Sequence, residues 1–332
     1  MILIAIRDII CTGDKMKIVV LDGYATNPGD LSWDFLSNYG DLTVNWRCSD
    51  DEIVEKAKDA DIVINNKCNM TKEVLDMLPN LKYIGLQSTG FNAVDVEAAS
   101  ANGVIVSNVP AYSTNEVAQH TFALILEITN NVGLYSNAVH EGAWSNAENF
   151  CFYLEPLDEL NNKTIGIIGF GSIGKRVANI SKAFGMNVLV STPHPEEDKY
   201  KDFTFCSLDE LLTKSDIVTC HCPLKENTIK LINKETISKM KKSAIFINTS
   251  RGAVVDDEAL ANALNNSKIA AAGLDVLTVE PPKKDNPLLR AKNCFITPHI
   301  AWGATQTRAR LLGVIEENLK AFINGKPQNV VN

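Results

Sequence analysis

One short segment, Thr164 to Lys175, constrains the fold of the chain more than any other. It reads TIGIIGFGSIGK, a β-branched run followed by Gly169, Gly171 and Gly174 in the spacing G-x-G-x-x-G. Between a strand and a helix, such glycines permit a tight turn, close approach of the backbone to a pyrophosphate, and close packing of the helix on the strand. The pyrophosphate then lies at the helix N-terminus, where free N–H groups and the helix dipole favour an anion. The segment therefore predicts dinucleotide binding by a βαβ unit.

Strand-like and helix-like segments alternate on both sides of this motif. Between Met16 and Asn108 the strand-like runs are KIVVLDG, DLTVNW, DIVINN, LKYIGLQ and VIVSN. From Lys163 onward they are TIGIIGFG, NVLVST, FTFCS, DIVTCHCP, SAIFINTS, IAAAGLDV and CFITP. Such alternation predicts parallel sheets with helices on both faces. A chain of 332 residues is long for one core, so we expect two doubly wound α/β domains, a Rossmann-type cofactor domain and a flavodoxin-like substrate domain, with the active site in the cleft between them.

The expected domain boundaries follow from these segments. Residues 1–15 are predicted to be an N-terminal extension; they fit neither a signal peptide nor a membrane span, because Arg7 and Asp8 interrupt a run that has no basic leader. The apolar stretch NEVAQHTFALILEITNNVGLYSNAV predicts one long helix, and GATQTRARLLGVIEENLKAFINGK is a helical segment that we expect to pack on the first domain. We therefore assign residues 16–115 and 299–332 to the substrate domain and residues 116–298 to the cofactor domain.

Charge and cysteine spacing argue against several classes of partner. The formal net charge of −8 disfavours binding to nucleic acid and to anionic membranes. The eight cysteines form no C-x-x-C pair, and strand alternation in DIVTCHCPL separates His221 from Cys220 and Cys222, so no metal site is predicted. Thiols in this number without a disulfide framework indicate a reducing, cytoplasmic location.

Charged residues follow three of the predicted strands. Arg251 follows SAIFINTS, Glu280 lies in the loop after IAAAGLDV, and His299 follows CFITP. Ligands of parallel sheets bind outside the carboxyl ends of the strands, so we expect the three side chains to converge there. Arg251 suits a carboxylate or carbonyl oxygen, His299 can give or take a proton near neutral pH, and Glu280 would orient the imidazole and stabilise its protonated form. The set predicts hydride transfer coupled to proton transfer on a 2-oxo or 2-hydroxy acid.

These segments resemble the D-isomer-specific 2-hydroxyacid dehydrogenase family. The matching stretches are LQSTGFNAVDVEAA, NVPAYSTNEVAQHTFAL, TIGIIGFGSIGKRVA, INTSRGAVVDDEAL, AGLDVLTVEPP, NPLL and ITPHIAWGA. By that likeness Arg251, Glu280 and His299 fall on the family's catalytic positions. The resemblance implies that the substrate is bound by Ser88, Thr89, Gly90, Arg251 and His299, the first three through a backbone loop that receives the carboxylate. It implies cofactor contacts from Gly169, Gly171, Ser172, Ile173, Gly174, Thr192, Cys222, Pro223, Thr228, Thr249, Ser250 and Asp275, the last of which falls on a position facing the nicotinamide.

Within the family, VVLDGYATNPGDLSW, STGFNAVD, NVPAYST and HIAWGA are most similar to the glycerate dehydrogenase or hydroxypyruvate reductase branch. The resemblance implies reversible, NAD(P)H-dependent reduction of a small 2-oxo acid such as hydroxypyruvate or glyoxylate, in a homodimer paired through the cofactor domain. Two alternatives stay open. One is a non-enzymatic, NAD(H)-sensing corepressor of the same fold, and the other is a D-lactate or phosphoglycerate dehydrogenase of the same family.

The segment LVSTPHPEE bears on the choice between the two nicotinamide cofactors. Thr192 stands at the strand end where family members that prefer NAD often carry aspartate; its hydroxyl can bond a ribose hydroxyl but does not repel a 2′-phosphate. The acidic residues Glu196, Glu197 and Asp198 follow closely and disfavour that phosphate again. We therefore favour NAD(H), with NADP(H) or dual use as the alternative.

Four aromatic residues, Trp144, Phe150, Phe152 and Tyr153, precede the glycine motif. Two roles are open for them: they fold over the active site, of their own or of a partner subunit, or they form the core of a subunit interface. We favour the interface.

Overall fold

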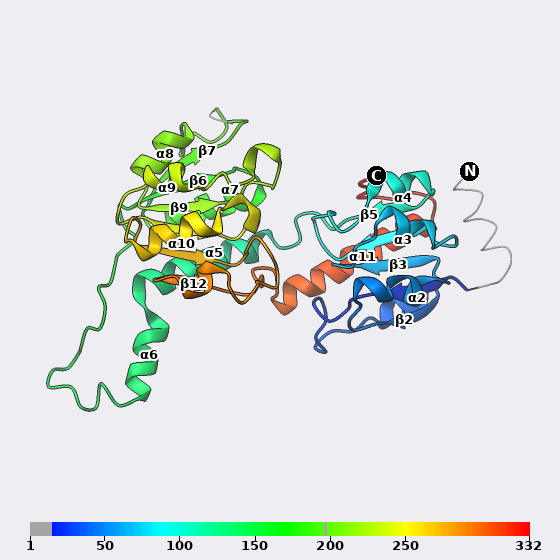
Figure 1. Ribbon diagram of the computed structural model, residues 1–332, viewed down its shortest axis with the longest axis horizontal. Coiled ribbons are helices and arrows are strands. Elements are labelled where there is room, and N and C mark those ends of the chain that lie inside the picture. Colours follow the sequence, from blue (N-terminus) through cyan, green and yellow to red (C-terminus); the bar gives the residue numbers. More distant parts are fainter. Residues whose placement is uncertain (1–14, 196–197) are drawn as a thin grey trace. The chain divides into compact units, whose positions relative to one another are not determined.

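The computed structural model describes residues 15–195 and 198–332, which divide into two compact units (Figure 1). The first unit holds the chain up to Tyr112 together with Gly303–Asn332, and the second unit holds Ser113–Trp302. Residues 1–14 of the expected extension lie outside the described residues, as do Glu196 and Glu197. Each unit is built around a parallel sheet of its own.

The first unit contains a five-stranded parallel sheet in the order β2-β1-β3-β4-β5. Its strands are β1 Lys17–Val20, β2 Asp41–Val44, β3 Ile62–Asn65, β4 Tyr83–Leu86 and β5 Ile105–Ser107. Its helices are α2 Ile53–Ala57, α3 Lys72–Asp76, α4 Val96–Ala101 and α11 Thr305–Ile323, with short 3-10 helices at Asp34–Asn38 and Asp50–Glu52. Every residue of β3 and β4 is buried, as expected for parallel strands that are covered on both faces.

Helices cover this sheet from two directions. α2, α3 and α4 share one core with the strands, to which they contribute Ile53, Leu75 and Ala99. α11 comes from the end of the chain, and its Phe322 stacks on Tyr83 of β4 with the ring centroids 4.6 Å apart. The strand order 2-1-3-4-5 is that of the flavodoxin-like doubly wound fold.

The second unit contains a seven-stranded parallel sheet in the order β12-β11-β10-β9-β6-β7-β8. Its strands are β6 Thr164–Ile168, β7 Asn187–Ser191, β8 Thr204–Phe205, β9 Ile217–Cys220, β10 Ile245–Asn248, β11 Ala271–Leu274 and β12 Cys294–Ile296. One face packs on α8 Leu208–Lys214, α9 Lys234–Ser238 and α10 Asp257–Asn265, and the other packs on α5 Thr114–Asn130 and α7 Ser172–Ala183 (Figure 1). Short 3-10 helices lie at Glu226–Thr228, Gly252–Val254 and Pro287–Arg290. The strand order reverses between β6 and β9, and doubly wound sheets bind their ligands at the carboxyl ends of the strands at such a point.

The prediction of one long helix before the glycine motif is wrong. The stretch forms two helices, α5 and α6 Val132–His140, and the residue between them, Asn131, has a left-handed backbone with φ 51° and ψ 38°. Asparagine tolerates this conformation better than most residues, so it ends one helix and allows a change of direction. α5 buries apolar residues such as Phe122 and Ile125 against the sheet, whereas α6 buries none of its residues.

Two absences concern the part of the chain that the structure describes. None of its helices is both long enough and apolar enough to cross a membrane. None of its groups of His, Cys, Asp and Glu side chains is arranged to hold a metal ion. At the end of β9, the thiols of Cys220 and Cys222 contact each other, while Nε2 of His221 lies 2.9 Å from the Thr219 hydroxyl.

Candidate active site

The glycine-rich turn joins β6 to α7 beside the point where the strand order reverses. Gly169 has a φ of +92°, and a Cβ there would lie 2.7 Å from the amide nitrogen of Cys222, so a larger residue does not fit. A Cβ at Gly174 would lie 2.2 Å from the carbonyl oxygen of Gly169, so this glycine lets α7 approach the turn. A Cβ at Gly171 would meet no atom within 4 Å. The turn is therefore closed towards β9 and α7 and open at Gly171.

The first turn of α7 suits an anion. The helix begins at Ser172, and its N-cap residue is Gly171, which has no side chain to bond the first amide groups. Ser172 is exposed, while Ile173 packs against the apolar core on the α7 face of the sheet. Amide groups at a helix N-terminus favour a phosphate both by hydrogen bonding and through the helix dipole. These residues fit the pyrophosphate of a dinucleotide.

Other residues expected at the cofactor close the loops around this turn. Cys222 and Pro223 are the second and third residues after β9, and Cys222 lies against Gly169. The Thr228 hydroxyl donates to the carbonyl oxygen of Pro223 at 2.7 Å and accepts from the amide of Lys225 at 2.7 Å. Thr192 follows β7, and its hydroxyl oxygen lies 3.5 Å from the amide nitrogen of His194. The side chain of Thr228 thus stabilises its own loop.

Three adjacent strands carry the predicted catalytic residues. Arg251 follows β10, Glu280 lies in the loop after β11, and His299 follows β12, and these strands are neighbours in the sheet. The next strands along the same edge are β9, which is followed by Cys222, and β6, which is followed by the glycine turn. The carboxyl ends of one sheet therefore present the dinucleotide turn and the three charged residues together.

Glu280 and His299 contact each other directly. Oε2 of Glu280 lies 2.5 Å from Nδ1 of His299, and Oε1 accepts a hydrogen bond from the amide of Leu277 at 3.1 Å. The side chains of His299 and Glu280 are 28% and 33% exposed, so a ligand can reach them. A carboxylate only accepts hydrogen bonds, so Nδ1 carries a proton. Nε2 is then the nitrogen of His299 that can exchange a proton with a ligand.

Arg251 lies at the end of a turn that Asn248 holds. The side-chain amide of Asn248 donates to the carbonyl oxygen of Arg251 at 3.0 Å, and Oδ1 of Asn248 accepts from the amide and the hydroxyl of Ser250 at 3.0 and 2.8 Å. A Cβ at Gly252 would lie 1.9 Å from the carbonyl carbon of Leu277, so this glycine lets the turn pack against the loop that follows β11. The guanidinium of Arg251 is exposed and donates to the carbonyl oxygen of Ser250 at 2.7 Å.

Asp275 is engaged within the protein. Its side chain is 1% exposed, and its carboxylate accepts hydrogen bonds from the Thr297 hydroxyl at 2.7 Å and from the amides of Ile300 and Ala301 at 2.8 Å each. The resemblance places this residue opposite the nicotinamide. In the structure its carboxylate binds the two residues that follow His299, so it fixes the turn that carries the imidazole.

Sequence reasoning missed several polar residues that support the site from within. The Thr121 hydroxyl of α5 lies 3.0 Å from that of Thr249, and Nε2 of His120 lies 2.9 Å from the Thr297 hydroxyl. Asn248, which holds the Arg251 turn, is fully buried. A signal was present for His120 and Thr121, because both directly precede the apolar run FALIL of NEVAQHTFALILE, and polar groups buried in a helix need partners.

In the first unit, the loop after β4 holds the residues expected to receive a carboxylate. The Ser88 hydroxyl donates to the carbonyl oxygen of Gly90 at 2.6 Å, and the Thr89 hydroxyl donates to that of Val109 at 2.7 Å. The side chain of Asn108 donates to the carbonyl oxygen of Thr89 at 2.7 Å. Within residues 15–195 and 198–332, the backbone amides of Ser88, Thr89 and Gly90 donate to no protein acceptor. Side-chain hydrogen bonds thus hold the loop, and among the described residues its amide groups are available for an anion.

Known proteins resemble the chain over almost its whole length. Residues 122–301 match the family model described as D-isomer specific 2-hydroxyacid dehydrogenase, NAD binding domain. A hydroxypyruvate reductase from Blautia hydrogenotrophica is 46% identical over 324 residues, which cover 96% of this chain and 100% of the relative. A glycerate dehydrogenase from Methylorubrum extorquens is 37% identical over 317 residues, which cover 95% of this chain and 98% of the relative.

A solved structure shares the fold of both units. The NADPH-dependent glyoxylate/hydroxypyruvate reductase from Sinorhizobium meliloti, in complex with NADP and malonate, matches with a TM-score of 0.82 at 27% identity and covers 96% of this chain and 97% of that one. The matched family domain contains the glycine turn and the residues on β10, β11 and β12. The resemblance stated from the sequence is therefore confirmed. The chain belongs to the D-isomer-specific 2-hydroxyacid dehydrogenase family.

Proposed function

We propose that the protein reversibly reduces a small 2-oxo acid, such as hydroxypyruvate or glyoxylate, to the D-2-hydroxy acid with a nicotinamide cofactor. One observation carries the proposal: the Glu280–His299 pair lies on the same sheet edge as the glycine turn. A proton donor held beside a dinucleotide site is what carbonyl reduction by hydride requires. The names of the relatives, hydroxypyruvate reductase and glycerate dehydrogenase, support this class of substrate.

Each catalytic role follows from the chemistry of the side chain. A bound nicotinamide would supply the hydride for C2 of the substrate. His299 donates the proton on Nε2 to the carbonyl oxygen during reduction and takes it back during oxidation. Glu280 accepts a hydrogen bond from Nδ1 and so orients the ring. Arg251 offers a permanently charged, planar fork for the carboxylate or the carbonyl oxygen of the substrate.

We further propose a division of labour between the two units. We propose that residues 116–298, which lie within the second unit, bind the cofactor. Residues 16–115 and 299–332, which comprise the first unit from residue 16 onward and the adjoining residues 113–115 and 299–302 of the second, are proposed to bind the substrate. The amides of Ser88, Thr89 and Gly90, which donate to no acceptor in the part of the chain that the structure describes, support this assignment, because a row of such amides suits a carboxylate. We propose that the cofactor is surrounded by the glycine turn and by the residues that follow it, Ser172 and Ile173. The loops that hold Thr192, Cys222, Pro223 and Thr228 are proposed to complete its site. We also propose cofactor contacts from the residues that follow β10 and β11, namely Thr249, Ser250 and Asp275.

We propose NAD(H) as the preferred cofactor, with NADP(H) or dual use as the alternative. Thr192 provides a hydroxyl at the end of β7 and no carboxylate to repel a 2′-phosphate, and one relative of known structure binds NADP. The acidic Asp198 nearby favours the cofactor without the extra phosphate. Kinetic efficiencies measured with NADH and NADPH decide the question, and a preference for NADPH of roughly tenfold or more, worth about 1.4 kcal/mol, would overturn our choice.

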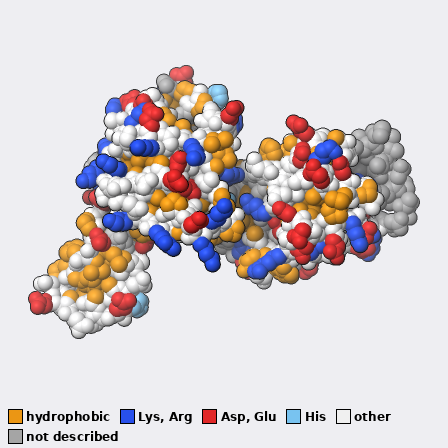
Figure 2. Space-filling view, viewed as in Figure 1, with side chains coloured by type: hydrophobic (Ala, Val, Ile, Leu, Met, Phe, Trp, Pro, Cys, Tyr) orange, Lys and Arg blue, Asp and Glu red, His pale blue; other side chains and the backbone are white. Residues whose placement is uncertain are grey.

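We also propose that the protein is a homodimer paired through an arm of the second unit, residues 132–158. α6 buries none of its residues, and Trp144, Phe150 and Tyr153 are 54%, 89% and 77% exposed. Figure 2 shows the apolar side chains of this arm gathered in one patch at the lower left. Large exposed apolar patches mark sites of protein contact. We infer that a second copy of the chain covers the patch.

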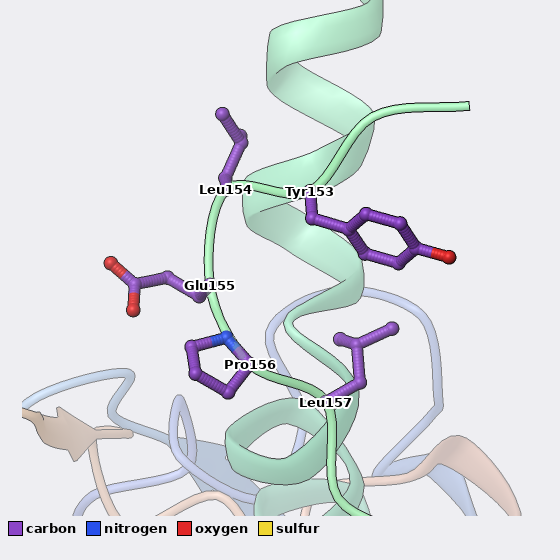
Figure 3. Close-up of a pocket in the computed structure, with 5 residues that line it drawn as sticks. All are labelled: Tyr153, Leu154, Glu155, Pro156 and Leu157. Carbon is purple, nitrogen blue, oxygen red and sulfur yellow. The ribbon is translucent and has the colours of Figure 1, made fainter. Parts of the chain in front are cut away.

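The far segment of the arm is held to α6. The Tyr135 hydroxyl donates to the carbonyl oxygen of Glu155 at 2.9 Å and accepts from the amide of Leu154 at 3.0 Å. A shallow hollow on this segment is lined by Tyr153, Leu154, Glu155, Pro156 and Leu157 (Figure 3). Tyr153 and Leu157 point to one side of the segment and Glu155 to the other (Figure 3). These contacts support an interface in preference to a lid.

Light scattering on the purified protein tests the dimer. We expect the mass of two chains, and we expect the joint replacement Phe150→Ser and Tyr153→Ser to give a folded monomer. A monomeric unsubstituted protein would contradict the proposal.

We place the protein in the cytoplasm, because the seven cysteines of the described residues are free thiols. Localisation of a tagged protein outside the cytoplasm would contradict this assignment.

A panel of 2-oxo acids tests the proposed reaction. We expect purified protein to oxidise NADH or NADPH in the presence of hydroxypyruvate or glyoxylate, and more slowly with pyruvate or 3-phosphohydroxypyruvate. Faster turnover with one of the last two acids would assign the protein to the lactate or phosphoglycerate type. Binding of NADH without turnover of any 2-oxo acid would contradict the proposed enzymatic activity and favour the NAD(H)-sensing alternative.

A further inference from the structure

A row of partly buried side chains links α5 to the turn that carries His299. Nε2 of His120, in the middle of α5, lies 2.9 Å from the Thr297 hydroxyl and 3.6 Å from Oδ1 of Asp275. The Thr297 hydroxyl donates to the same carboxylate oxygen at 2.7 Å. The carboxylate in turn accepts from the amides of Ile300 and Ala301. One row of hydrogen bonds therefore runs from α5 to the backbone directly after His299.

The direction of these bonds fixes a proton on His120. A threonine hydroxyl has one proton, and at Thr297 it points to the carboxylate of Asp275, which can only accept. The oxygen of Thr297 must then accept from His120, so Nε2 of His120 carries a hydrogen. The side chain of His120 is 18% exposed and that of Asp275 is 1% exposed, so water is a poor substitute for these partners.

His299 needs such support because of its backbone. Its φ is +55°, a left-handed conformation that residues with a side chain rarely adopt. The amide of His299 donates to the carbonyl oxygens of Asp275 at 2.8 Å and Thr297 at 3.0 Å. The main chain and the side chain of Asp275 thus hold the amides on both sides of the imidazole. A strained backbone persists only where its surroundings specify it in this way.

We propose that His120 is a positioning residue for the reaction, acting through Thr297 and Asp275 to keep His299 in its left-handed turn. The inference rests on the proposed function, because it concerns the orientation of the proton donor, His299. The His120 ring is hydrogen-bonded to Thr297 and lies 3.6 Å from the carboxylate of Asp275, so its action on His299 is indirect. The hydrogen bonds from His120 through Thr297 and Asp275 fix the backbone turn that carries His299, and Glu280 fixes the rotation of the imidazole ring.

A matched pair of substitutions at His120 separates hydrogen bonding from packing. His120→Leu keeps a similar volume but offers no donor, whereas the amide nitrogen of His120→Gln can reach the place of Nε2. We expect His120→Leu to lower kcat by roughly tenfold or more, because small misplacement of a proton donor is costly. The dissociation constant of the cofactor and the KM of the 2-oxo acid should stay within about twofold, and His120→Gln should restore most of kcat.

A second pair keeps the test decisive if His120→Leu does not fold. Thr297→Val removes the hydroxyl and Thr297→Ser retains it, so only the first should lower kcat. When both single variants fold, the kcat of the double variant His120→Leu with Thr297→Val should be no lower than that of the slower single variant. Both substitutions break the same row of hydrogen bonds, so their effects should not add. Wild-type kcat in His120→Leu or Thr297→Val, or equal losses in the leucine and glutamine variants, would overturn the inference alone. Inactivity of the unsubstituted protein towards every 2-oxo acid would overturn the proposed function and the inference with it.

Discussion

The two units share an architecture and differ in the chemistry at the carboxyl ends of their strands. In the second unit, neighbouring strands end in charged side chains, Arg251, Glu280 and His299. In the first unit, the loop after β4 offers backbone amides, and the buried Gln87 before it has neither amide atom paired within the described residues. The same doubly wound fold therefore carries charged groups that can move protons in one copy and neutral groups that can only bind in the other. The fold fixes where a ligand binds, and the residues after each strand decide what happens to it.

The largest effect should come from the proton donor of the second unit. We expect His299→Ala to lower kcat by roughly 100- to 10,000-fold, which is the usual contribution of a positioned acid or base. The dissociation constant for NADH should change little, because the glycine turn is untouched. Steady-state kinetics together with equilibrium binding of NADH check both statements. A large loss of cofactor affinity would show that His299 is structural, and the contrast between the units would lose its main support.

An intermediate effect should come from the cation of the same unit. Arg251→Lys keeps the charge but loses the planar fork, so we expect kcat/KM for the 2-oxo acid to fall by roughly tenfold. The turn itself should persist, because Asn248 binds the carbonyl oxygen of residue 251 and not its side chain. Unchanged kinetic constants in this variant would remove Arg251 from the site.

The smallest effect should come from the first unit, whose role is binding. Thr89→Val removes the hydroxyl that bonds the carbonyl oxygen of Val109 and so loosens the amide loop. We expect KM for the 2-oxo acid to rise by about threefold to tenfold, the value of one hydrogen bond, with kcat nearly unchanged. Thr89→Ser is the matched control and should behave as the unsubstituted protein. If Thr89→Val lowered kcat with an unchanged KM, the first unit would share in the chemistry and the comparison would fail.

Much of the fold could be predicted because its signals are local. The β-branched runs of both sheets and the glycine spacing from Gly169 to Gly174 are readable within a few residues. The helix break at Asn131 was missed, because the apolar pattern continues on both sides of it and only the backbone conformation marks the end of α5.

The supporting parts of the site were harder to predict, because they depend on contacts between distant segments. His120 and Thr297 are 177 residues apart, and no spacing in the sequence joins them. The family resemblance assigns Asp275 to the cofactor, yet its carboxylate bonds residues that follow a different strand. The charged residues at the strand ends were accessible to sequence reasoning because parallel topology alone brings such ends to one edge.

The central claim is that the charged edge of the second unit directs hydride and proton to a carbonyl group. Its most direct test uses NADH that carries deuterium at the transferable position, with hydroxypyruvate as substrate and mass and NMR analysis of the product. We expect D-glycerate with one deuterium at C2. D-glycerate without deuterium, L-glycerate, or no glycerate at all would contradict the claim.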